Sequence, residues 1–595
     1  MNPSILLILR RMRVPLIVLS TVYMVAVFGM TLIPGQDDQG NVWYMDFFHA
    51  FYFVSFMGTT IGFGEIPYPF TEEQRLWATV CVYLTVTAWF YTIGTILSLL
   101  QQEALKRALT EGRFIRAVKN IREPFFIICG YGDAGIALVR GLVQYNIRSV
   151  ILDNNQLAID HLTMENHPIS NPGLCGDAGN PSTLLHAGLQ HPHCAGIVAI
   201  TNENHVNLKI ALTSKLLNPQ LPATCRADFY SIEANMKSFG TKHIVDPFDI
   251  FATRFLTTLN SPNIQFLHDW LSAKRGDPIP ELIEPPRGLW ILCGYGRFGR
   301  AMYKRMRSER LDIIVIEASP NVNGLPKDTI LGTGTEAHTL RNANIENAVG
   351  IIAGTDDDVN NLSIIMTAKA INRGLFVIAR QNVHDNQALF DEIAANLTMK
   401  SSEIIANHIR ILLTTPLMTQ FKDQSRFKPN QWACVIISRL VGMVTEEAPS
   451  VWAVTIDKES ACALISVMED NNEVKLSHLT HDPRQHSELL HCIPLLLERS
   501  GSSTTSFDYN QAGRLLPSED TVLKPGDQLL FCGRDQDRQL MEWNLKHRPT
   551  IDYLMTGKDC TQSRVLHWLE KKLSHTVNEA STQPPTDSDN DRQPQ

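Results

Sequence analysis

The sequence contains no Cys-x-x-Cys pair, and its 11 cysteines are scattered along 595 residues. Several of them, such as Cys129, Cys293 and Cys532, lie in apolar runs typical of strands. This distribution indicates buried thiols in a reducing compartment and argues against a disulfide framework. Charged residues make up only 19 % of the chain, below the roughly one quarter typical of soluble proteins. The net charge of −8 is the opposite of a basic nucleic-acid footprint, so we expect no nucleic-acid partner.

Long charge-free apolar runs are present near the N-terminus. The length of the chain suggests about four units, and the first of them has the pattern of a membrane unit. Residues 14–33 and 76–100 carry no charge and are long enough to span a bilayer. A signal peptide usually has a shorter apolar core and a small-residue cleavage site, and no clear site follows here, so an uncleaved span is favoured over a signal peptide. Basic residues precede the first run and follow the second, which places residues 34–75 outside and both termini in the cytoplasm.

An aromatic segment and a glycine-rich stretch lie between these two runs. Residues 46–57 are too few to cross a bilayer and too apolar for a wet loop, which predicts a re-entrant pore helix. Residues 58–65 follow directly and read Gly-Thr-Thr-Ile-Gly-Phe-Gly-Glu. Gly62 and Gly64 permit backbone conformations in which several carbonyls point the same way and replace an ion's water shell.

Residues 58–65 resemble the Thr-Val-Gly-Tyr-Gly-Asp filter of potassium channels. The order of span, re-entrant helix, filter and span is that of the two-span members of this family. The resemblance implies a selectivity filter in which backbone carbonyls hold K+, with the filter made of Thr60, Ile61, Gly62, Phe63 and Gly64.

The stretch departs from the family pattern in ways that bear on function. Phe63 replaces a tyrosine and removes a hydroxyl that often ties the filter to the pore helix, which puts the rigidity of the filter in question. Glu65 keeps an acid at the outer mouth. Gly94 in the second run is a candidate gating hinge, and an ordinary small residue at a helix contact is the alternative.

The rest of the chain carries one pattern twice. An apolar run, typical of a strand buried on both faces, leads into Gly-x-Gly-x-x-Gly and an amphipathic helix. About 20 residues further on, each copy has a strand that ends in an acid, Asp153 or Glu317. Two copies in this context predict two Rossmann-type units. The loop residues are Gly130, Tyr131, Gly132, Asp133, Ala134 and Gly135 in the first copy, and Gly294, Gly296, Arg297, Phe298 and Gly299 in the second.

This layout predicts a nucleotide ligand. The glycines let the backbone approach a pyrophosphate, which meets the positive end of a helix. Asp153 and Glu317 can accept hydrogen bonds from ribose hydroxyls, and their charge disfavours the extra phosphate of NADP. We therefore expect NAD or another adenine nucleotide as a regulatory ligand. The alternative for each copy is that the glycines serve packing alone and the fold binds nothing.

The repeats look like RCK domains, the TrkA-type regulators of potassium conductance, over about residues 125–280 and 288–540. In that family the loop holding Asp177 and Ala178, together with Thr201, also lines the nucleotide cleft. A two-span pore followed by tandem RCK domains resembles prokaryotic channels of the GsuK and MthK type. The resemblance implies a homotetramer in the lipid bilayer of the cell membrane, with a cytoplasmic ring of RCK domains below the pore.

The expected fold is an α-helical two-span pore domain plus two α/β Rossmann-type RCK domains, the second followed by a small α+β lobe. Strand-like pieces of that lobe are 432–437, 451–456, 463–467 and 528–532. The expected parts are the pore domain 1–100, a linker helix 101–122, the first RCK domain 123–285 with a reduced C-terminal lobe, the second Rossmann lobe 286–428, the C-terminal lobe 429–545 and a disordered tail 575–595.

Two clusters could bind metal. His186, His191, His193 and Cys194 lie within nine residues, but without the firm spacing of a metal motif, so a polar helix and loop is the favoured interpretation. The run Asp356-Asp357-Asp358 could hold Ca2+, which takes several carboxylates. A solvated acidic run that caps a helix is favoured for it, and Ca2+ stays a candidate ligand.

The pattern as a whole predicts a ligand-gated, potassium-selective channel and not an enzyme. A membrane-anchored NAD-dependent oxidoreductase is one alternative, but it leaves the re-entrant segment and the filter unexplained. A regulatory subunit of a separate potassium transporter is another, although soluble TrkA-type subunits lack spans.

Overall fold

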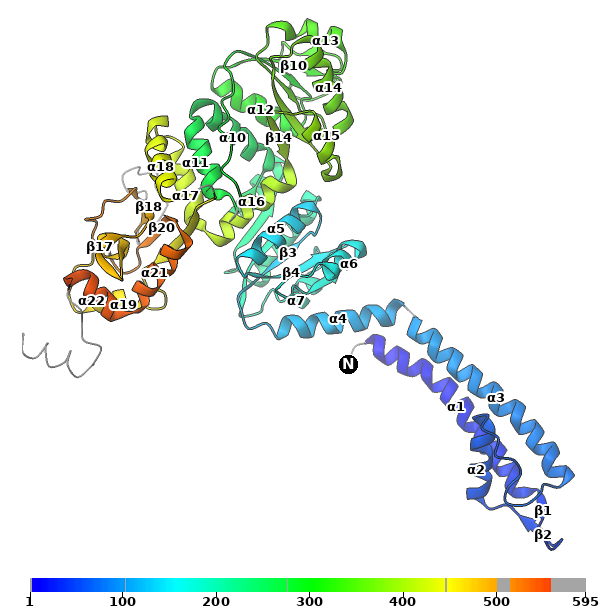
Figure 1. Ribbon diagram of the computed structural model, residues 1–595. Helices are drawn as coiled ribbons and strands as arrows, with labels where there is room; N and C mark the ends of the chain where they lie inside the picture. The colour runs from blue at the N-terminus through cyan, green and yellow to red at the C-terminus, as the bar shows by residue number, and fades with distance from the viewer. Residues whose placement is uncertain (1–2, 102, 275–276, 445–446, 500–513, 558–595) are drawn as a thin grey trace, which may run out of the picture. The chain divides into compact units, whose positions relative to one another are not determined.

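The computed structural model describes residues 3–101, 103–274, 277–444, 447–499 and 514–557 (Figure 1). The chain forms two compact units. The first comprises residues 1–128, 148–196 and 217–221, and the second comprises residues 129–147, 197–216 and 222 onward. The boundary between the units therefore passes through the first Rossmann repeat. The tail expected at 575–595 lies outside the described residues.

The membrane-type part is built from two long helices and a short one. Helices α1 (Pro3–Leu32) and α3 (Glu72–Gln101) pack along each other, and α2 (Phe47–Gly58) contacts both (Figure 1). The stretches Met12–Leu32 and Glu72–Ser98 are long and apolar enough to cross a membrane, where residues 14–33 and 76–100 were expected. A hairpin of β1 (Pro34–Gln36) and β2 (Val42–Tyr44) follows α1. Buried apolar side chains from α1 and α2 join the three helices.

The first repeat is a six-stranded sheet in the order β5-β4-β3-β6-β7-β8, the doubly wound order expected for a Rossmann unit. Apolar strands with buried side chains alternate with amphipathic helices, which is why the sheet can be covered on both faces. Its elements are β3 (Phe125–Cys129), α5 (Asp133–Gln144), β4 (Arg148–Asp153), α6 (Gln156–Met164), β5 (Gly173–Cys175), α7 (Pro181–His186), β6 (Cys194–Ala199), α8 (Asn204–Leu217), β7 (Ala223–Arg226), α9 (Tyr230–Ser238) and β8 (His243–Val245).

The second repeat has the same topology, with parallel strands in the order β11-β10-β9-β12-β13-β14. The predicted pair of Rossmann folds is confirmed. Its elements are β9 (Leu289–Cys293), α12 (Arg297–Ser308), β10 (Asp312–Glu317), β11 (Ile330–Leu331), α13 (Ala337–Asn342), β12 (Gly350–Ala353), α14 (Asp358–Ile371), β13 (Phe376–Gln381), α15 (Gln387–Glu392) and β14 (Leu397–Lys400).

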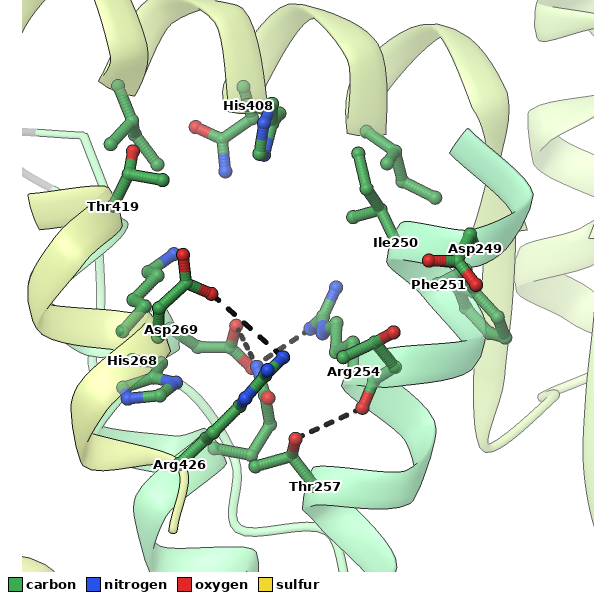
Figure 2. Close-up of a pocket in the computed structure, with 17 residues that line it drawn as sticks. Asp249, Ile250, Phe251, Arg254, Thr257, His268, Asp269, His408, Thr419 and Arg426 are labelled. Atoms are coloured by element: carbon green, nitrogen blue, oxygen red, sulfur yellow. Dashed lines mark hydrogen bonds and ion pairs between the residues drawn. The ribbon is translucent and has the colours of Figure 1, made fainter. Parts of the chain in front are cut away.

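Each repeat ends in a pair of helices joined at a proline. The pairs are α10 (Pro247–Asn260) with α11 (Pro262–Ser272), and α16 (Ser401–Thr414) with α17 (Pro416–Ser425). Proline at the first position of α11 and of α17 ends the preceding helix and starts the next. Helix α16 packs on α10, α17 and the first repeat's α5, and a cavity opens between the two helix pairs (Figure 2).

The C-terminal lobe is an antiparallel sheet in the order β15-β20-β18-β19 with helices around it. Strands β15 (Ser450–Thr455) and β20 (Gln528–Gly533) lie where strands were expected, with β18 (Cys492–Glu498) and β19 (Arg514–Leu515) beside them. The predicted strands at 432–437 and 463–467 are wrong, because these residues form α18 (Asn430–Met443) and α19 (Cys462–Glu469). A short apolar run fits either state, and in α18 the buried residues recur every three or four positions. Helices α21 (Asp535–Lys546) and α22 (Arg548–Thr556) pack on α19.

The cysteines in the strands are buried as expected. Cys129, Cys293 and Cys532 are at most 1 % exposed, and none of the three forms a disulfide. Burial raises the pKa of the Cys293 thiol to about 12, so it stays protonated and unreactive at neutral pH.

Burial of His268 is expected to lower the stability of the helix pairs at acidic pH. His268 is 4 % exposed and its Nε2 lies 2.7 Å from Ser425 Oγ, across from α11 to α17. Burial, and then the charges of Lys422 and Arg426, lower its pKa from 6.5 to about 3. The unfolded chain therefore binds the extra proton between these values, and stability is lost as pH falls below about 6.5.

We predict that His268→Gln flattens this acid dependence. Glutamine keeps a polar group for Ser425 but cannot gain the proton, so the variant avoids a loss of about 1 kcal/mol per pH unit. Thermal unfolding of the full chain in detergent between about pH 7 and pH 5 measures this. Parallel curves for wild type and variant would contradict the assignment of the acid sensitivity to His268.

Candidate functional site: the filter segment and the two glycine loops

The segment after α2 leaves helical geometry and presents bare carbonyls. Thr60, Gly62 and Gly64 have positive φ of 63°, 69° and 92°. The amides of Thr60 and Ile61 donate to the last carbonyls of α2, at 3.0 Å and 2.9 Å. Among the residues that the structure describes, no hydrogen bond ends on the carbonyl oxygens of residues 60–63. A row of unpaired carbonyls next to an apolar helix can coordinate a dehydrated cation.

The side chain of Phe63 packs against α2. Its ring stacks on Tyr52 at 6.5 Å and meets Phe56 edge-on at 5.4 Å, both on α2. Such aromatic contacts are worth about 0.5–1.5 kcal/mol each beyond area burial. Packing against α2 therefore supports this segment without the hydroxyl that phenylalanine lacks.

The acid at the end of the segment is tied to α3. The Glu65 carboxylate accepts from Arg75 Nε at 2.8 Å and Nη2 at 3.2 Å, and also from the Phe70 amide at 2.8 Å. A bidentate pair of this kind fixes geometry as well as charge. The sequence places Arg75 only at the start of an apolar run, so its role was missed.

Gly94 lies in α3 with open space around it. Apart from the adjacent backbone of α3, no atom of the described residues lies within 4 Å of the point where a Cβ would stand. The alternative that Gly94 is a small residue required at a helix contact therefore has no support within this chain, and the hinge stays a prediction.

The first glycine loop joins β3 to α5 and is shaped by its glycines. Gly130 has φ of 106°, and a Cβ there would lie 3.0 Å from the Thr201 amide nitrogen. A Cβ on Gly135 would lie 2.2 Å from the Gly130 carbonyl oxygen. Gly132 faces open space, Tyr131 is buried, and α5 begins at Asp133 and Ala134. Two glycines therefore serve packing, and the middle one leaves room beside a helix N-terminus, where a pyrophosphate can approach.

Thr201 at the end of β6 is locked by a residue that the sequence reasoning did not single out for a role. Its Oγ1 donates to Asn207 Oδ1 at 2.7 Å, and Asn207 Nδ2 donates to the Arg226 carbonyl at 3.2 Å. Thr355 and Asn361 repeat the arrangement in the second copy, at 2.7 Å. The spacing Thr-x5-Asn in both copies is the signal that could have revealed it.

The predicted ribose acid and the next loop lie together in the first unit. Asp153 ends β4, its Oδ1 accepts from the Asn155 amide at 2.8 Å, and its carbonyl accepts from the Gly176 amide at 2.8 Å. Asp177 follows and accepts from the Gly179 amide at 2.7 Å, while Ala178 is buried. The carboxyl ends of β4 and β5 therefore meet, as the predicted cleft requires.

Helix α4 (Glu103–Lys119), which follows α3, packs on the same part of the first repeat. It contacts β5 and α7, burying Ala108, Phe114 and Val118. Glu111 Oε1 lies 2.9 Å from His186 Nδ1 at the end of α7. The helix that follows the second apolar run therefore rests on the strand that leads into the Asp177 loop.

The second glycine loop is similar in shape but its acid is already engaged. Gly294 has φ of 91°, and a Cβ on Gly299 would lie 2.0 Å from the Gly294 carbonyl oxygen. The Glu317 carboxylate accepts from the Tyr295 amide of its own loop at 2.6 Å, and from the Ser319 amide at 3.1 Å. The carboxylate that was predicted to bind a ribose is therefore already hydrogen-bonded to an amide of its own glycine loop. Phe298 is fully buried and packs in the core.

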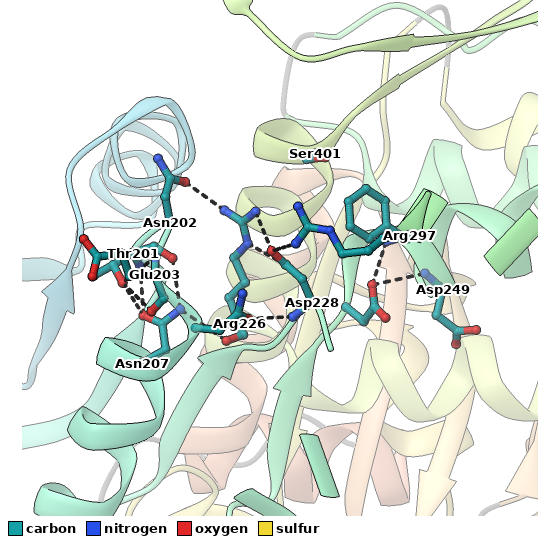
Figure 3. Close-up of polar contacts among 12 residues, drawn as sticks. Thr201, Asn202, Glu203, Asn207, Arg226, Asp228, Asp249, Arg297 and Ser401 are labelled. Atoms are coloured by element: carbon teal, nitrogen blue, oxygen red, sulfur yellow. Dashed lines mark hydrogen bonds and ion pairs between the residues drawn. The ribbon is translucent and has the colours of Figure 1, made fainter. Parts of the chain in front are cut away.

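Arg297 of the second loop reaches to the first repeat (Figure 3). Its Nη1 donates to Asp228 Oδ2 at 2.6 Å, and Arg226 binds the same carboxylate at 2.8 Å and 3.1 Å. The Arg297 guanidinium also lies over the Phe229 and Phe248 rings, at 5.0 Å and 5.3 Å. This side chain, predicted to serve a nucleotide, joins the two repeats, and nucleotide binding by the second copy stays a prediction.

The candidate metal clusters have other partners. Asp357 caps α14 through the Val359 amide at 2.8 Å, and buried Asp358 accepts from Asn382, Val383 and Asn386. Across the described ranges, no group of three or more His, Cys, Asp or Glu side chains is placed to hold a metal. The role in capping a helix fits the interpretation favoured for the acidic run, and Ca2+ binding stays an untested prediction.

Comparisons with known proteins agree with this layout. The profile of the TrkA-N domain matches residues 126–247 and 290–400, one match on each Rossmann sheet. The chain contains two TrkA-N domains in tandem. It is 24 % identical over 230 residues to Potassium channel protein 1 of Methanocaldococcus jannaschii, covering 38 % of this chain and 67 % of that protein. It is 26 % identical over 242 residues to Probable potassium channel protein 2 of the same organism, covering 39 % and 67 %.

Solved structures also resemble the whole chain. The GsuK channel bound to NAD is similar over 92 % of this chain and all of its own, at 17 % identity and a TM-score of 0.44. A second GsuK channel structure covers 94 % of this chain at 17 % identity and a TM-score of 0.47.

The contact between Arg297 and Asp228 gives a double-mutant test. We predict that Arg297→Met and Asp228→Asn are non-additive by about 1 kcal/mol or more, because each removes the same charged hydrogen bond. Urea unfolding of the full chain in detergent measures the coupling. Arg300→Met, whose Nε donates to the Tyr295 carbonyl, is the matched control and should add to Asp228→Asn within about 0.5 kcal/mol. Additive behaviour of Arg297→Met would contradict the contact.

Proposed function

We propose that this protein is a potassium-selective channel whose gate responds to a nucleotide bound by the first TrkA-N domain. The observation that carries the proposal is the row of unpaired carbonyls at residues 60–63, set between two helices of membrane length. Lipid offers such groups no partner, so non-helical backbone at this depth needs a cation path or protein cover. The names of the two Methanocaldococcus jannaschii relatives support potassium as the ion.

The pore requires several copies of the chain. One chain supplies one filter segment, and potassium filters are built from a ring of such segments. Ile61 and Phe63 are more than 60 % exposed on the single chain, which fits side chains that neighbouring subunits cover. We infer a fourfold homotetramer with both termini in the cytoplasm and residues 34–75 outside, in line with the basic flanks.

The proposed ligand is NAD, NADH or another adenine nucleotide in the first cleft. Gly132 opens onto free space, and the acid Asp153 ends β4. The chains of GsuK have been solved with NAD and with ADP. In the second copy, Glu317 and Arg297 already have protein partners, so we propose that the first copy binds the nucleotide more tightly. The nucleotide serves as a regulator in this proposal and is not consumed.

Helix α4 offers a route from the cleft to the pore. It follows α3 and rests on β5, which leads into the Asp177 loop. A ligand gates only if it binds the open and closed states with different affinity. We propose that nucleotide contact with the Asp177 loop shifts β5 and with it α4.

Ion selectivity is the first test. Purified protein in lipid vesicles should carry K+ much faster than Na+, because the carbonyl row replaces the water shell of K+. Gly62→Ala should abolish the flux, since Gly62 holds φ of 69° where alanine is strained. Gly112→Ala in α4, where an added Cβ meets open space, is the matched control and should conduct normally. Equal K+ and Na+ flux would overturn the proposal.

Nucleotide binding is tested by calorimetry on the full chain in detergent. We expect Asp153→Asn to weaken NADH binding by about tenfold or more, because a charged hydrogen bond to the ribose is lost. Glu317→Gln should change it by less than about twofold. Asp160→Asn, one helix away on α6, is the control and should leave binding unchanged. Turnover of NADH, or equal loss in Asp153→Asn and Glu317→Gln, would contradict the assignment.

A further inference from the structure

A cavity of about 310 Å³ lies between the helix pairs that end the two repeats. It is lined from α10, α11, α16 and α17, so both repeats contribute to its wall (Figure 2). Its size is at the lower end of small-molecule sites, which measure about 300–1,000 Å³. It lies apart from both glycine loops, none of whose residues line it.

The acids around this cavity are all matched by guanidinium groups. Asp249 is held by Arg305 through both oxygens, at 2.8 Å and 3.0 Å. Asp269 accepts from Arg254 Nη2 at 3.0 Å and from Gln265 at 2.8 Å. Asp423 lies 3.9 Å from Arg426 Nη1. Each of these carboxylates therefore already has a guanidinium partner.

Lys422 is the remaining cation on the cavity wall. Among the described residues, no carboxylate lies within 4.0 Å of its ammonium, and no side-chain hydrogen bond of Lys422 is formed. Burial lowers the pKa of Lys422 to about 8; the charge of Asp269 acts to raise it, and the charges of Arg254 and Arg410 act to lower it. Lys422 is part-buried, where an ammonium without a carboxylate partner is destabilised, and a bound anion would offset this.

The positive charge of Lys422 also acts on two histidines that line the cavity. After burial, the charge of Lys422 is the next cause that lowers the pKa of His268, to about 3, and of His408, to about 4. Both rings line the cavity. Hydroxyl and amide groups of Thr257, Thr419 and Asn407 complete its polar wall. The Thr419 hydroxyl and the Asn407 amide can donate to phosphate oxygens, whereas the Thr257 hydroxyl already donates to the Thr253 carbonyl at 3.0 Å.

We propose that this cavity binds a small phosphate-bearing anion, with the Lys422 ammonium as its charge partner. The site is separate from the proposed nucleotide cleft. Because α10 and α11 belong to the first repeat and α16 and α17 to the second, an occupant would bridge the repeats. It would favour whichever arrangement of the helix pairs brings Lys422 and Arg426 closest to its charge.

Pyrophosphate binding to the full chain in detergent, followed by calorimetry, tests the site. Lys422→Met removes the charge and keeps the length of the side chain, and should weaken binding by about tenfold or more. Lys422→Arg should retain binding. Lys428→Met, just beyond α17 and exposed, is the matched control and should match wild type. The glycine loops are unchanged in all four proteins, so any pyrophosphate binding at those loops contributes equally to each measurement.

Two results would overturn the proposal. One is equal pyrophosphate affinity in wild type and Lys422→Met, and the other is no binding to wild type at all. If Lys422→Met fails to fold, Thr419→Val takes its place and should weaken binding by several-fold. Failure of NADH binding in the earlier experiment would leave this result unaffected, since the two sites share no residue.

Discussion

The structure depends on one constraint, which is that backbone polar groups at membrane depth must be satisfied. Helices α1, α2 and α3 satisfy their own, and the short segment after α2 does not. Its amides are used on the end of α2 while its carbonyls stay bare. Phe63 against α2 and Glu65 against Arg75 hold this segment at either side. In the function proposed above, a K+ ion supplies the missing partner for these carbonyls.

The two repeats share one fold but use equivalent side chains differently. In both glycine loops the backbone packs directly on itself. The third glycine, Gly135 or Gly299, lies against the carbonyl oxygen of the first glycine of its loop. In the second copy the side chains of Glu317 and Arg297 are turned to structural use, on the loop itself and on Asp228. Burial, and then the charge of Arg297, also lower the pKa of Arg380 at the end of β13. In the second copy the Glu317 and Arg297 side chains therefore make structural contacts, and the contact of Arg297 with Asp228 joins the two repeats.

Local patterns were enough to predict the apolar spans, the helix before the filter and both Rossmann folds. Each rests on spacing within about 20 residues, and no distant contact is needed to recognise it. The strands predicted at 432–437 and 463–467 are wrong because a short apolar run fits either a strand or a helix, and both stretches are helical. Arg75, Asp228 and Lys422 were missed for another reason. Their roles depend on partners, or on a missing partner, that only the folded chain brings near.

Single-channel recording in a planar bilayer tests the pore and the regulatory domain in one experiment. With NADH added on the side of the TrkA-N domains, the fraction of time spent open should change. The unitary conductance and the reversal potential should stay those of a potassium-selective pore, because the filter is not touched. A current without potassium selectivity, or an open fraction that ignores every adenine nucleotide, would contradict a pore of bare carbonyls gated from the first glycine loop.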